Sequence, residues 1–469
     1  MDQLSRTQAA YRRPASTTKR DSGVKKKDPL LTLKYGVWAY FLLLIFEGAL
    51  RKWILPGLST PLLIVRDPVA IWLLIAVWQK GLFPFNSYVQ IAYFVGVLGI
   101  FTAISFGHGS IPVAIFGART LLIHFPMMFV IAQIFTRDDV IKLGKSTLFI
   151  AIPVALLIAV QFYSPQSAFV NIGVGGEGSA GFSGAMGFFR PSGTFSFNNG
   201  NSMFFSFVAC FVFYFLLNSQ EVNKLVLYGA TAGLLASIPL SISRSLFFHI
   251  IITFLFVIVG ISRKPKYMVN ILGALVALSI GILILNQTEF FQVAVQAFSR
   301  RFESANASEG GLEGVLLDRY LGGLVGALTD TDDLPFFGYG LGLGTNVASM
   351  LLTGGRGFLV SEGEWGRLIG ELGAVMGMVI IMVRLVFSFQ ITVSSYRKLA
   401  EGDLLPWLLL SFALLAIPQG GWAQPATLGF CTLIGGLVLA SLKTSTEEKK
   451  EVTNTRIKVS RYIRPVRTA

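Results

Sequence analysis

Long apolar segments recur along the whole chain and are separated by polar connections. A helix that crosses the hydrocarbon core of a membrane needs about 20 mostly apolar residues, at a rise of about 1.5 Å per residue. Twelve segments approach or exceed this length, so the pattern predicts an all-α polytopic membrane protein with about twelve transmembrane helices. The predicted helices cover residues 34–54, 61–78, 85–106, 111–135, 146–162, 200–217, 224–242, 245–261, 268–286, 366–393, 404–417 and 424–442.

The basic residues between these helices predict their orientation, because Lys and Arg are retained on the cytoplasmic side of a membrane. Residues 1–33 carry eight basic and three acidic side chains, which places this polar tail in the cytoplasm. Every second connection is then cytoplasmic too, and each contains basic residues. Both ends of the membrane domain, residues 34–442, are therefore expected inside, and a second basic tail, 443–469, follows it. The basic residues of the inner connections are Lys80, Arg137, Lys142, Lys145, Lys224, Arg263, Lys264, Lys266, Arg397 and Lys398.

The same alternation puts two long connections on the outer face, residues 163–199 and residues 287–365. The second lies between the ninth and tenth predicted helices and holds four arginines, no lysine and ten carboxylates, a net charge of −6. The chain as a whole has a net charge of +14. The positive excess is thus a cytoplasmic orientation signal, and the functional site is expected to face outward.

Composition narrows the class of protein further. The chain is 53% hydrophobic and 14% charged, whereas soluble domains carry about 25% charged residues. This balance excludes a soluble enzyme, a disulfide scaffold and a nucleic-acid binder. Cys210 and Cys431 lie in apolar runs, and the three histidines share no metal-ligand spacing. We expect no metal site and no cofactor.

Arginines on the outer side violate the orientation rule and call for a reason. Arg190 precedes the sixth predicted helix, Arg244 lies in the turn between the seventh and eighth, and Arg119 lies roughly 12 Å inside the fourth. Each could bind an anionic substrate. The alternatives are an interfacial snorkelling side chain for Arg190, a capping charge for Arg244, and an ion pair that locks helices for Arg119.

Three further groups of polar residues stand out. His124 is expected to be a satisfied interior histidine. The cluster of Glu47, Arg51, Lys52, Arg66 and Asp67 reads best as a self-neutralising network, because Glu47 and Arg51 have i,i+4 spacing. The polar stretch around Arg300 and Arg301, in the large outer connection, is expected to be helical.

The end of the large outer connection carries two candidate bases. Glu362 and Glu364 lie near the predicted membrane surface beside Trp365. Partial burial there could raise the pKa of a carboxylate and make it a usable base, and a solvated or capping acid is the alternative. The glycines of residues 338–342 do not form a dinucleotide fingerprint, because no strand precedes them, so they indicate backbone flexibility.

Four short segments between about residues 180 and 390 stand out together. They are Arg190-Pro191-Ser192-Gly193-Thr194-Phe195 with Asn198 and Asn199, Ser243-Arg244-Ser245, Asp318-Arg319 followed by Pro335-Phe336-Phe337-Gly338-Tyr339-Gly340-Leu341-Gly342, and Glu371-Leu372-Gly373. In this order they resemble the O-antigen ligase and O-antigen polymerase superfamily of bacterial envelope glycosyltransferases. The ligases have a histidine nine residues before the Glu of Glu-Leu-Gly, where this chain has Glu362, and this difference favours a polymerase-like or exopolysaccharide enzyme.

The resemblance implies a metal-independent, inverting glycosyltransferase of the bacterial inner membrane. Its donor would be a polyprenyl-diphosphate-linked glycan, with a glycan or lipid acceptor. Arg244 and Arg319, and more loosely Arg190, would bind the diphosphate, with Arg119 as a further candidate, and Glu362 or Glu364 would act as base. Membrane lipid and other polysaccharide-assembly proteins are the expected partners, and nucleic acid is not.

A transporter or lipid-glycan flippase is the competing class, since twelve helices with both termini inside is a common transporter layout. The unusual residues gather near the outer loops rather than at the midplane, which favours the glycosyltransferase. A membrane scaffold for an export complex is a third, weaker alternative.

Overall fold

A computed structural model of the protein describes residues 28–178, 181–262, 287–309, 334–354, 359–361 and 363–443. Eight helical segments in these ranges are long and apolar enough to cross a membrane, and three shorter apolar helices accompany them. The eight are Leu31–Ile54 (α1 Leu31–Ala49, η1 Leu50–Ile54), Pro61–Gln79 (η3 Pro61–Ile64, α2 Asp67–Gln79), Ser87–Ser105 (α3), Ile111–Ile134 (α4 Ile111–Arg119, η4 Thr120–His124, α5 Phe125–Ile134), Arg137–Tyr163 (α6), Asn198–Leu217 (α7), Arg244–Ser262 (α9) and Glu364–Glu401 (α15). The three shorter ones are α8 (Lys224–Leu240), α16 (Leu405–Gln419) and α17 (Pro425–Ser441).

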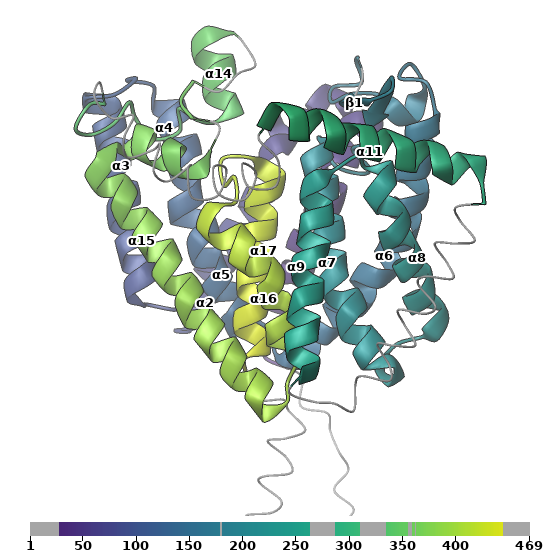
Figure 1. Ribbon diagram of the computed structural model, residues 1–469. Coiled ribbons are helices and arrows are strands. Elements are labelled where there is room, and N and C mark those ends of the chain that lie inside the picture. The colour runs from purple at the N-terminus through teal and green to yellow at the C-terminus, as the bar shows by residue number, and fades with distance from the viewer. Residues whose placement is uncertain are drawn as a thin grey trace, which may run out of the picture.

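The remaining elements are small. An amphipathic helix, α11 (Glu289–Glu309), a short helix, α14 (Asn346–Thr353), and an antiparallel hairpin of β1 (Phe182–Ala185) and β2 (Phe188–Arg190) lie at one end of the bundle, which is the upper end in Figure 1. There α11 runs across the ends of α8 and α9 (Figure 1). Three single turns complete the list: η2 Pro56–Leu58, η5 Phe169–Asn171 and η6 Ser219–Glu221.

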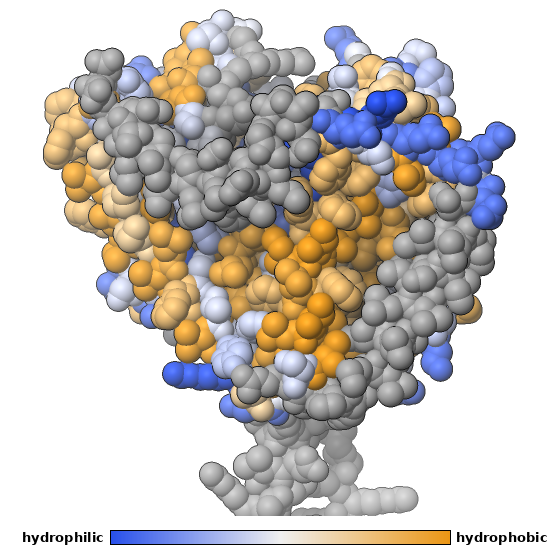
Figure 2. Space-filling view, viewed as in Figure 1, coloured by the Kyte–Doolittle hydropathy of each residue, from blue (hydrophilic) through white to orange (hydrophobic). Residues whose placement is uncertain are grey.

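The distribution of apolar side chains matches a bundle that lies in lipid. The central helix α7 is almost wholly buried and is packed by α6, α8, α9, α16 and α17. Large apolar side chains are also exposed on the outside of the bundle, and Figure 2 shows them as a hydrophobic band with hydrophilic groups above and below. A soluble protein seldom exposes so large an apolar surface. The fold is therefore that of a multi-pass membrane protein.

Most predicted helices agree with the structure to within a few residues. Eleven of the twelve correspond to described helices, and the ninth, residues 268–286, lies outside the described residues. The fifth begins nine residues earlier than predicted, at Arg137. Thr136 and Asp139 form a capping box there: the Thr136 hydroxyl accepts from the Asp139 amide, and the Asp139 carboxylate accepts from the Thr136 amide.

The tenth predicted helix, 366–393, is wrong in one respect, because α15 is interrupted at Gly373. The backbone there has a φ of 77° and a ψ of 167°, a conformation that essentially only glycine adopts. A continuous helix would hold Glu364 and Arg384 about 30 Å apart. Instead, Arg384 Nη1 donates a hydrogen bond to Glu364 Oε1 over 2.7 Å. Residues 364–372 therefore form a short helix that folds back onto the long helix 374–401.

The glycine-rich segment 334–345 is a packed loop rather than the flexible one expected. The amides of Tyr339 and Gly340 donate to the carbonyl oxygens of Gly370 and Glu371 at 2.7 and 3.1 Å. These carbonyls end the short helix and would otherwise lack partners. Gly342 has a φ of 97°, and any side chain on it would overlap the Val113 carbonyl oxygen in α4. The glycines of this loop thus allow its backbone to pack closely against α4 and against the short helix 364–372.

Candidate functional site: an arginine cluster at the upper end

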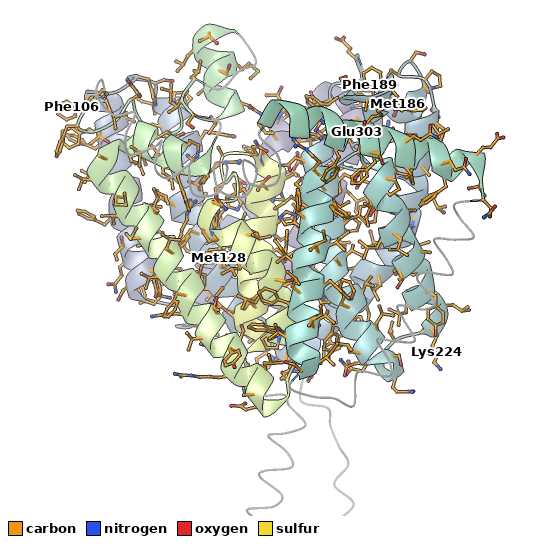
Figure 3. The ribbon with its side chains drawn as sticks, in the orientation of Figure 1. Phe106, Met128, Met186, Phe189, Lys224 and Glu303 are labelled. Carbon is orange, nitrogen blue, oxygen red and sulfur yellow. The ribbon has the colours of Figure 1, made fainter. Side chains whose placement is uncertain are left out.

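Arg190 closes the hairpin and begins the loop that leads into α7. Its strand β2 pairs with β1, and Phe182 and Arg190 are direct partners across the hairpin. The next residues, 191–197, run without regular structure to the start of α7 at Asn198. Figure 3 labels Met186 and Phe189 of the hairpin at the upper end, near Glu303 of α11, whereas Lys224 lies at the opposite end.

Two basic side chains from the end of the first helix hold this loop. Lys52 is 1% exposed, and its Nζ donates to Ser192 Oγ at 2.9 Å and to the Gly193 carbonyl oxygen at 2.7 Å. Arg51 Nη1 donates to Ser196 Oγ at 2.9 Å and to Glu47 Oε1 at 3.0 Å. The loop after Arg190 is therefore fixed to the bundle, which fixes the base of the Arg190 side chain as well.

Arg244 enters the same region from the first residue of α9. The turn before it is held by serines: Ser202 of α7 donates to Ser243 Oγ at 2.8 Å, and Ser243 and Ser245 share a hydrogen bond of 3.1 Å. Such interhelical hydrogen bonds fix the position of a helix end within a membrane bundle. Arg244 is thus placed at the upper end by both α7 and its own turn.

Arg301 comes from α11 and was not singled out as a site residue from the sequence. Phe298 and Phe302 of α11 pack on Phe247, one turn below Arg244, with ring centroids 5.8 and 5.6 Å apart. Helix α11 also contacts β1. These contacts bring Arg301, which lies between the two phenylalanines, to the hairpin and to the start of α9. The sequence carried one signal for it: Arg300 and Arg301 are basic residues of an expected helix within the acidic connection 287–365.

Arg190 lies close enough to Arg301 and Arg244 for their positive charges to act on it. Burial lowers the pKa of Arg190, and the positive charges of Arg301 and Arg244 lower it further. Arg190 Nε is buried without a hydrogen-bond partner, and no carboxylate in the described part of the chain forms an ion pair with Arg190. We call Arg190, Arg244 and Arg301 the arginine cluster. Such a concentration of positive charge is favourable when an anion lies among the guanidinium groups.

Of the other sequence-predicted site residues, the structure describes Arg119 and Glu364, and neither is part of the arginine cluster. Arg319 and Glu362 fall outside the described residues. Arg119 is buried in the bundle and donates to Asp67 Oδ2 at 2.8 Å. Asp67 Oδ1 also contacts His124 Nε2 at 3.0 Å, and His124 Nδ1 lies 3.1 Å from the Tyr40 hydroxyl. Arg119 is thus part of an internal ion pair, and His124 is satisfied as expected.

The position of Glu364 argues against the role of base. Its carboxylate accepts two hydrogen bonds from Arg367, at 2.7 and 3.0 Å, one from Arg384 at 2.7 Å and one from the Trp422 amide at 3.1 Å. All of its lone-pair directions are occupied. Arg367 also donates to Glu371 at 2.6 Å, which completes a buried network of two acids and two arginines. Arg384 was not singled out from the sequence, although a charged residue within an apolar helix by itself indicates a buried partner or a functional role.

The expected self-neutralising cluster at the ends of the first two helices is confirmed in part. Arg51 pairs with Glu47, and Arg66 lies 3.7 Å from the same carboxylate. Lys52, however, turns to the loop after Arg190, and Asp67 turns to Arg119. These side chains at the ends of the first two helices therefore contact both the buried ion pair of Arg119 with Asp67 and the loop that follows Arg190.

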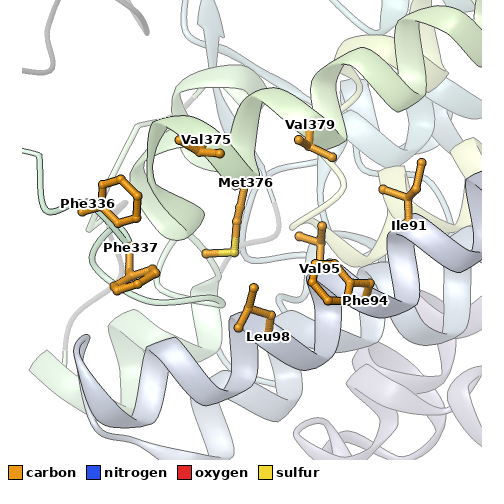
Figure 4. Close-up of a pocket in the computed structure, with 9 residues that line it drawn as sticks. All are labelled: Ile91, Phe94, Val95, Leu98, Phe336, Phe337, Val375, Met376 and Val379. Carbon is orange, nitrogen blue, oxygen red and sulfur yellow. The ribbon is translucent and has the colours of Figure 1, made fainter.

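A separate apolar pocket of about 430 Å³ opens between α3 and α15 (Figure 4). It is lined by apolar side chains alone, and two of them, Phe336 and Phe337, come from the glycine-rich loop. It lies on the other side of the bundle from α11 (Figure 1). The lining residues are Ile91, Phe94, Val95, Leu98, Phe336, Phe337, Val375, Met376 and Val379.

Comparison of the chain with models of known families, with curated proteins and with solved structures finds no match. The length and hydropathy of its helices define it as a multi-pass membrane protein. Any more specific function is inferred from the residues themselves and their arrangement.

Proposed function

We propose that the protein is a membrane glycosyltransferase that uses a polyprenyl-diphosphate-linked glycan at the outer face of a bacterial inner membrane. The observation that carries this proposal is the convergence of Arg190, Arg244 and Arg301 from three elements at one end of the bundle. A diphosphate is the anion that a lipid-linked sugar donor presents at a membrane surface. Guanidinium groups suit it because each can donate two parallel hydrogen bonds to phosphate oxygens.

The reaction would be a single displacement. An acceptor hydroxyl oxygen attacks the anomeric carbon, and the bond from that carbon to the diphosphate oxygen breaks with inversion. The bonding electron pair leaves with the diphosphate, whose developing negative charge the arginine cluster stabilises. The hydroxyl proton passes to a base. Because Glu364 is saturated by Arg367 and Arg384, we assign this role to Glu362, and Arg319 remains a further diphosphate ligand.

The orientation that the proposal needs agrees with the distribution of charge. The upper end carries the hairpin and α11, and the lower end carries Lys224 (Figure 3). With both termini in the cytoplasm and twelve helices, the lower end faces inward and the arginine cluster faces outward. The product would be O-antigen, capsule or exopolysaccharide, and a polymerase-like enzyme is favoured because Glu362 replaces the histidine of the ligases.

The apolar pocket between α3 and α15 supports a reaction with two lipid-linked substrates. A polymerase joins two such glycans and must accommodate two lipid chains. The pocket has no charged lining residue and lies away from the arginine cluster. It therefore suits a chain other than that of the donor bound at the arginines.

A lipid-glycan flippase is the second candidate. The intramembrane ion pairs of Arg119 with Asp67 and of Arg384 with Glu364 would favour it, since charges inside a membrane bundle often mark transport paths. Both pairs are closed and buried, however, whereas the three arginines of the cluster are each only partly buried.

The test uses the purified protein with the polyprenyl-diphosphate glycan extracted from its native membranes, and follows release of lipid diphosphate and growth of the glycan. We expect Arg244→Gln and Arg301→Gln to lower turnover by at least tenfold. Arg300→Gln is the matched control, because Arg300 is exposed and pairs with Glu303 on the same helix. Equal activity of Arg301→Gln and Arg300→Gln, or lipid movement without glycosidic bond formation, would contradict the proposal.

A further inference from the structure

Two exposed phenylalanine rings lie beside the arginine cluster. Phe182 of β1 and Phe197, the residue before α7, are each 44% exposed, and their ring centroids are 5.9 Å apart. Phe195, two residues before Phe197, is by contrast 1% exposed. Phe197 is exposed although the loop 191–197 that carries it is held by Arg51 and Lys52. Both rings are therefore accessible at the upper end.

The hairpin register places one of these rings next to Arg190. Phe182 and Arg190 are direct partners in the antiparallel pair of β1 and β2. Side chains of directly opposed residues project from the same face of a hairpin, with Cβ atoms about 5 Å apart. The Phe182 ring and the Arg190 guanidinium group are thus neighbours on one surface, and Phe197 extends this surface towards α7.

We propose that Phe182 and Phe197 form a stacking platform for the first sugar ring of the lipid-linked glycan. This inference rests on the proposed function. In a glycosyl diphosphate the anomeric carbon is bonded directly to a phosphate oxygen, so the first sugar ring lies next to the diphosphate. The apolar C–H face of a pyranose packs on an aromatic ring, whose face carries partial negative charge. An arginine that binds the diphosphate and an aromatic ring on the directly opposed residue of the hairpin match that arrangement.

The hairpin that carries Phe182 is held firmly against the helical bundle. The hairpin rests on the turn between α8 and α9, where the side chain of Ile242 approaches Gly184. Phe188, on the same face as Arg190, stacks on Phe162 of α6 with centroids 4.6 Å apart. These contacts make the hairpin a rigid support, and rigidity lowers the entropy lost when a ligand binds.

The experiment measures binding of two probes to the purified protein by native mass spectrometry. One probe is polyprenyl diphosphate without sugar, and the other is the polyprenyl-diphosphate glycan extracted from the native membranes. We expect Phe182→Ala to weaken binding of the glycan-bearing lipid by threefold to tenfold, an effect of the size of one aromatic contact. Binding of bare polyprenyl diphosphate should change by less than twofold. Phe182→Tyr, which keeps the ring, should bind both probes as the wild type does.

Phe169→Ala is the matched control, because Phe169 is an exposed phenylalanine of the same connection. Its carbonyl oxygen, which the substitution keeps, accepts from Trp53 Nε1 and from the Ile172 amide. Equal loss of both probes in Phe182→Ala would overturn the platform, since the ring would then act through Arg190. Unchanged binding of both probes would overturn it as well. If the wild type binds neither probe, the proposed function itself fails, which separates the two outcomes.

Discussion

Arg384 meets Glu364 inside the bundle at 2.7 Å, although twenty residues of α15 separate them. The contact exists because the helix reverses at Gly373, and it joins the short helix 364–372 to the long helix 374–401. Trp422 closes the network from the loop between α16 and α17, through its amide on Glu364 and its ring 4.4 Å from the Arg384 guanidinium carbon. One carboxylate therefore joins the two parts of α15 and the loop before α17.

Replacing the Glu364 carboxylate should lower the stability of the folded protein. Glu364→Gln leaves Arg384 without a negative partner in a buried site, which typically costs about 3–5 kcal/mol. We expect a clear fall in the thermal unfolding temperature of the detergent-solubilised protein. Glu362→Gln should abolish glycan transfer, because we assign the role of base to Glu362. The double variant Glu364→Gln, Arg384→Met should recover most of the lost stability, and a single variant as stable as the wild type would refute this account.

The reversal itself can be tested at Gly373. Alanine strongly disfavours the backbone conformation of Gly373, and its Cβ would overlap the Phe336 carbonyl oxygen. Strain in this region of the backbone map costs about 1–3 kcal/mol before any overlap. Gly373→Ala should therefore lower the unfolding temperature. Gly57→Ala is the control, because a Cβ at Gly57 meets nothing within 4 Å. Equal effects of the two substitutions would show that the reversal is not required.

Arg119 should behave as a structural residue and not as a ligand for the diphosphate. Arg119→Met leaves the buried Asp67 with His124 alone as a partner, so stability should fall. The KM for the lipid-linked donor should stay within about twofold of the wild type, whereas Arg244→Gln should raise it. The measurements are the unfolding temperature and the donor dependence of the initial rate. A raised KM in an Arg119→Met protein that stays folded would show instead that Arg119 binds the donor.

The orientation of the bundle can be read from cysteine labelling. Cys210 and Cys431 are fully buried and should not react with a membrane-impermeant maleimide, so the wild type serves as its own control. Ser183 in the hairpin and Lys80 after α2 are exposed. Ser183→Cys should be labelled in cells with only the outer membrane opened. Lys80→Cys should be labelled only after the inner membrane is permeabilised, and the reverse pattern would invert the topology.

The sequence was sufficient for the helices that face lipid. Their apolar length follows from the thickness of the membrane, so each helix can be recognised from its own residues. Arg190 and Arg244 could also be singled out, because a basic residue on the side expected to face outward breaks a rule that applies position by position. The i,i+4 pair of Glu47 and Arg51 was local enough to be foreseen, and the structure contains it.

Contacts between distant segments were decided only by the tertiary structure. The local sequence predicts one helix through Gly373, whereas its conformation is set by the loop 334–345 packed against it. Glu364 looked like a surface acid because its partner Arg384 is distant along the chain. Arg301 is brought to Arg190 and Arg244 by aromatic contacts between α11 and α9, and the spacing of residues along the chain does not predict these contacts. Helix formation in a membrane is a local property of each segment, whereas the pairing of buried charges depends on which helices become neighbours.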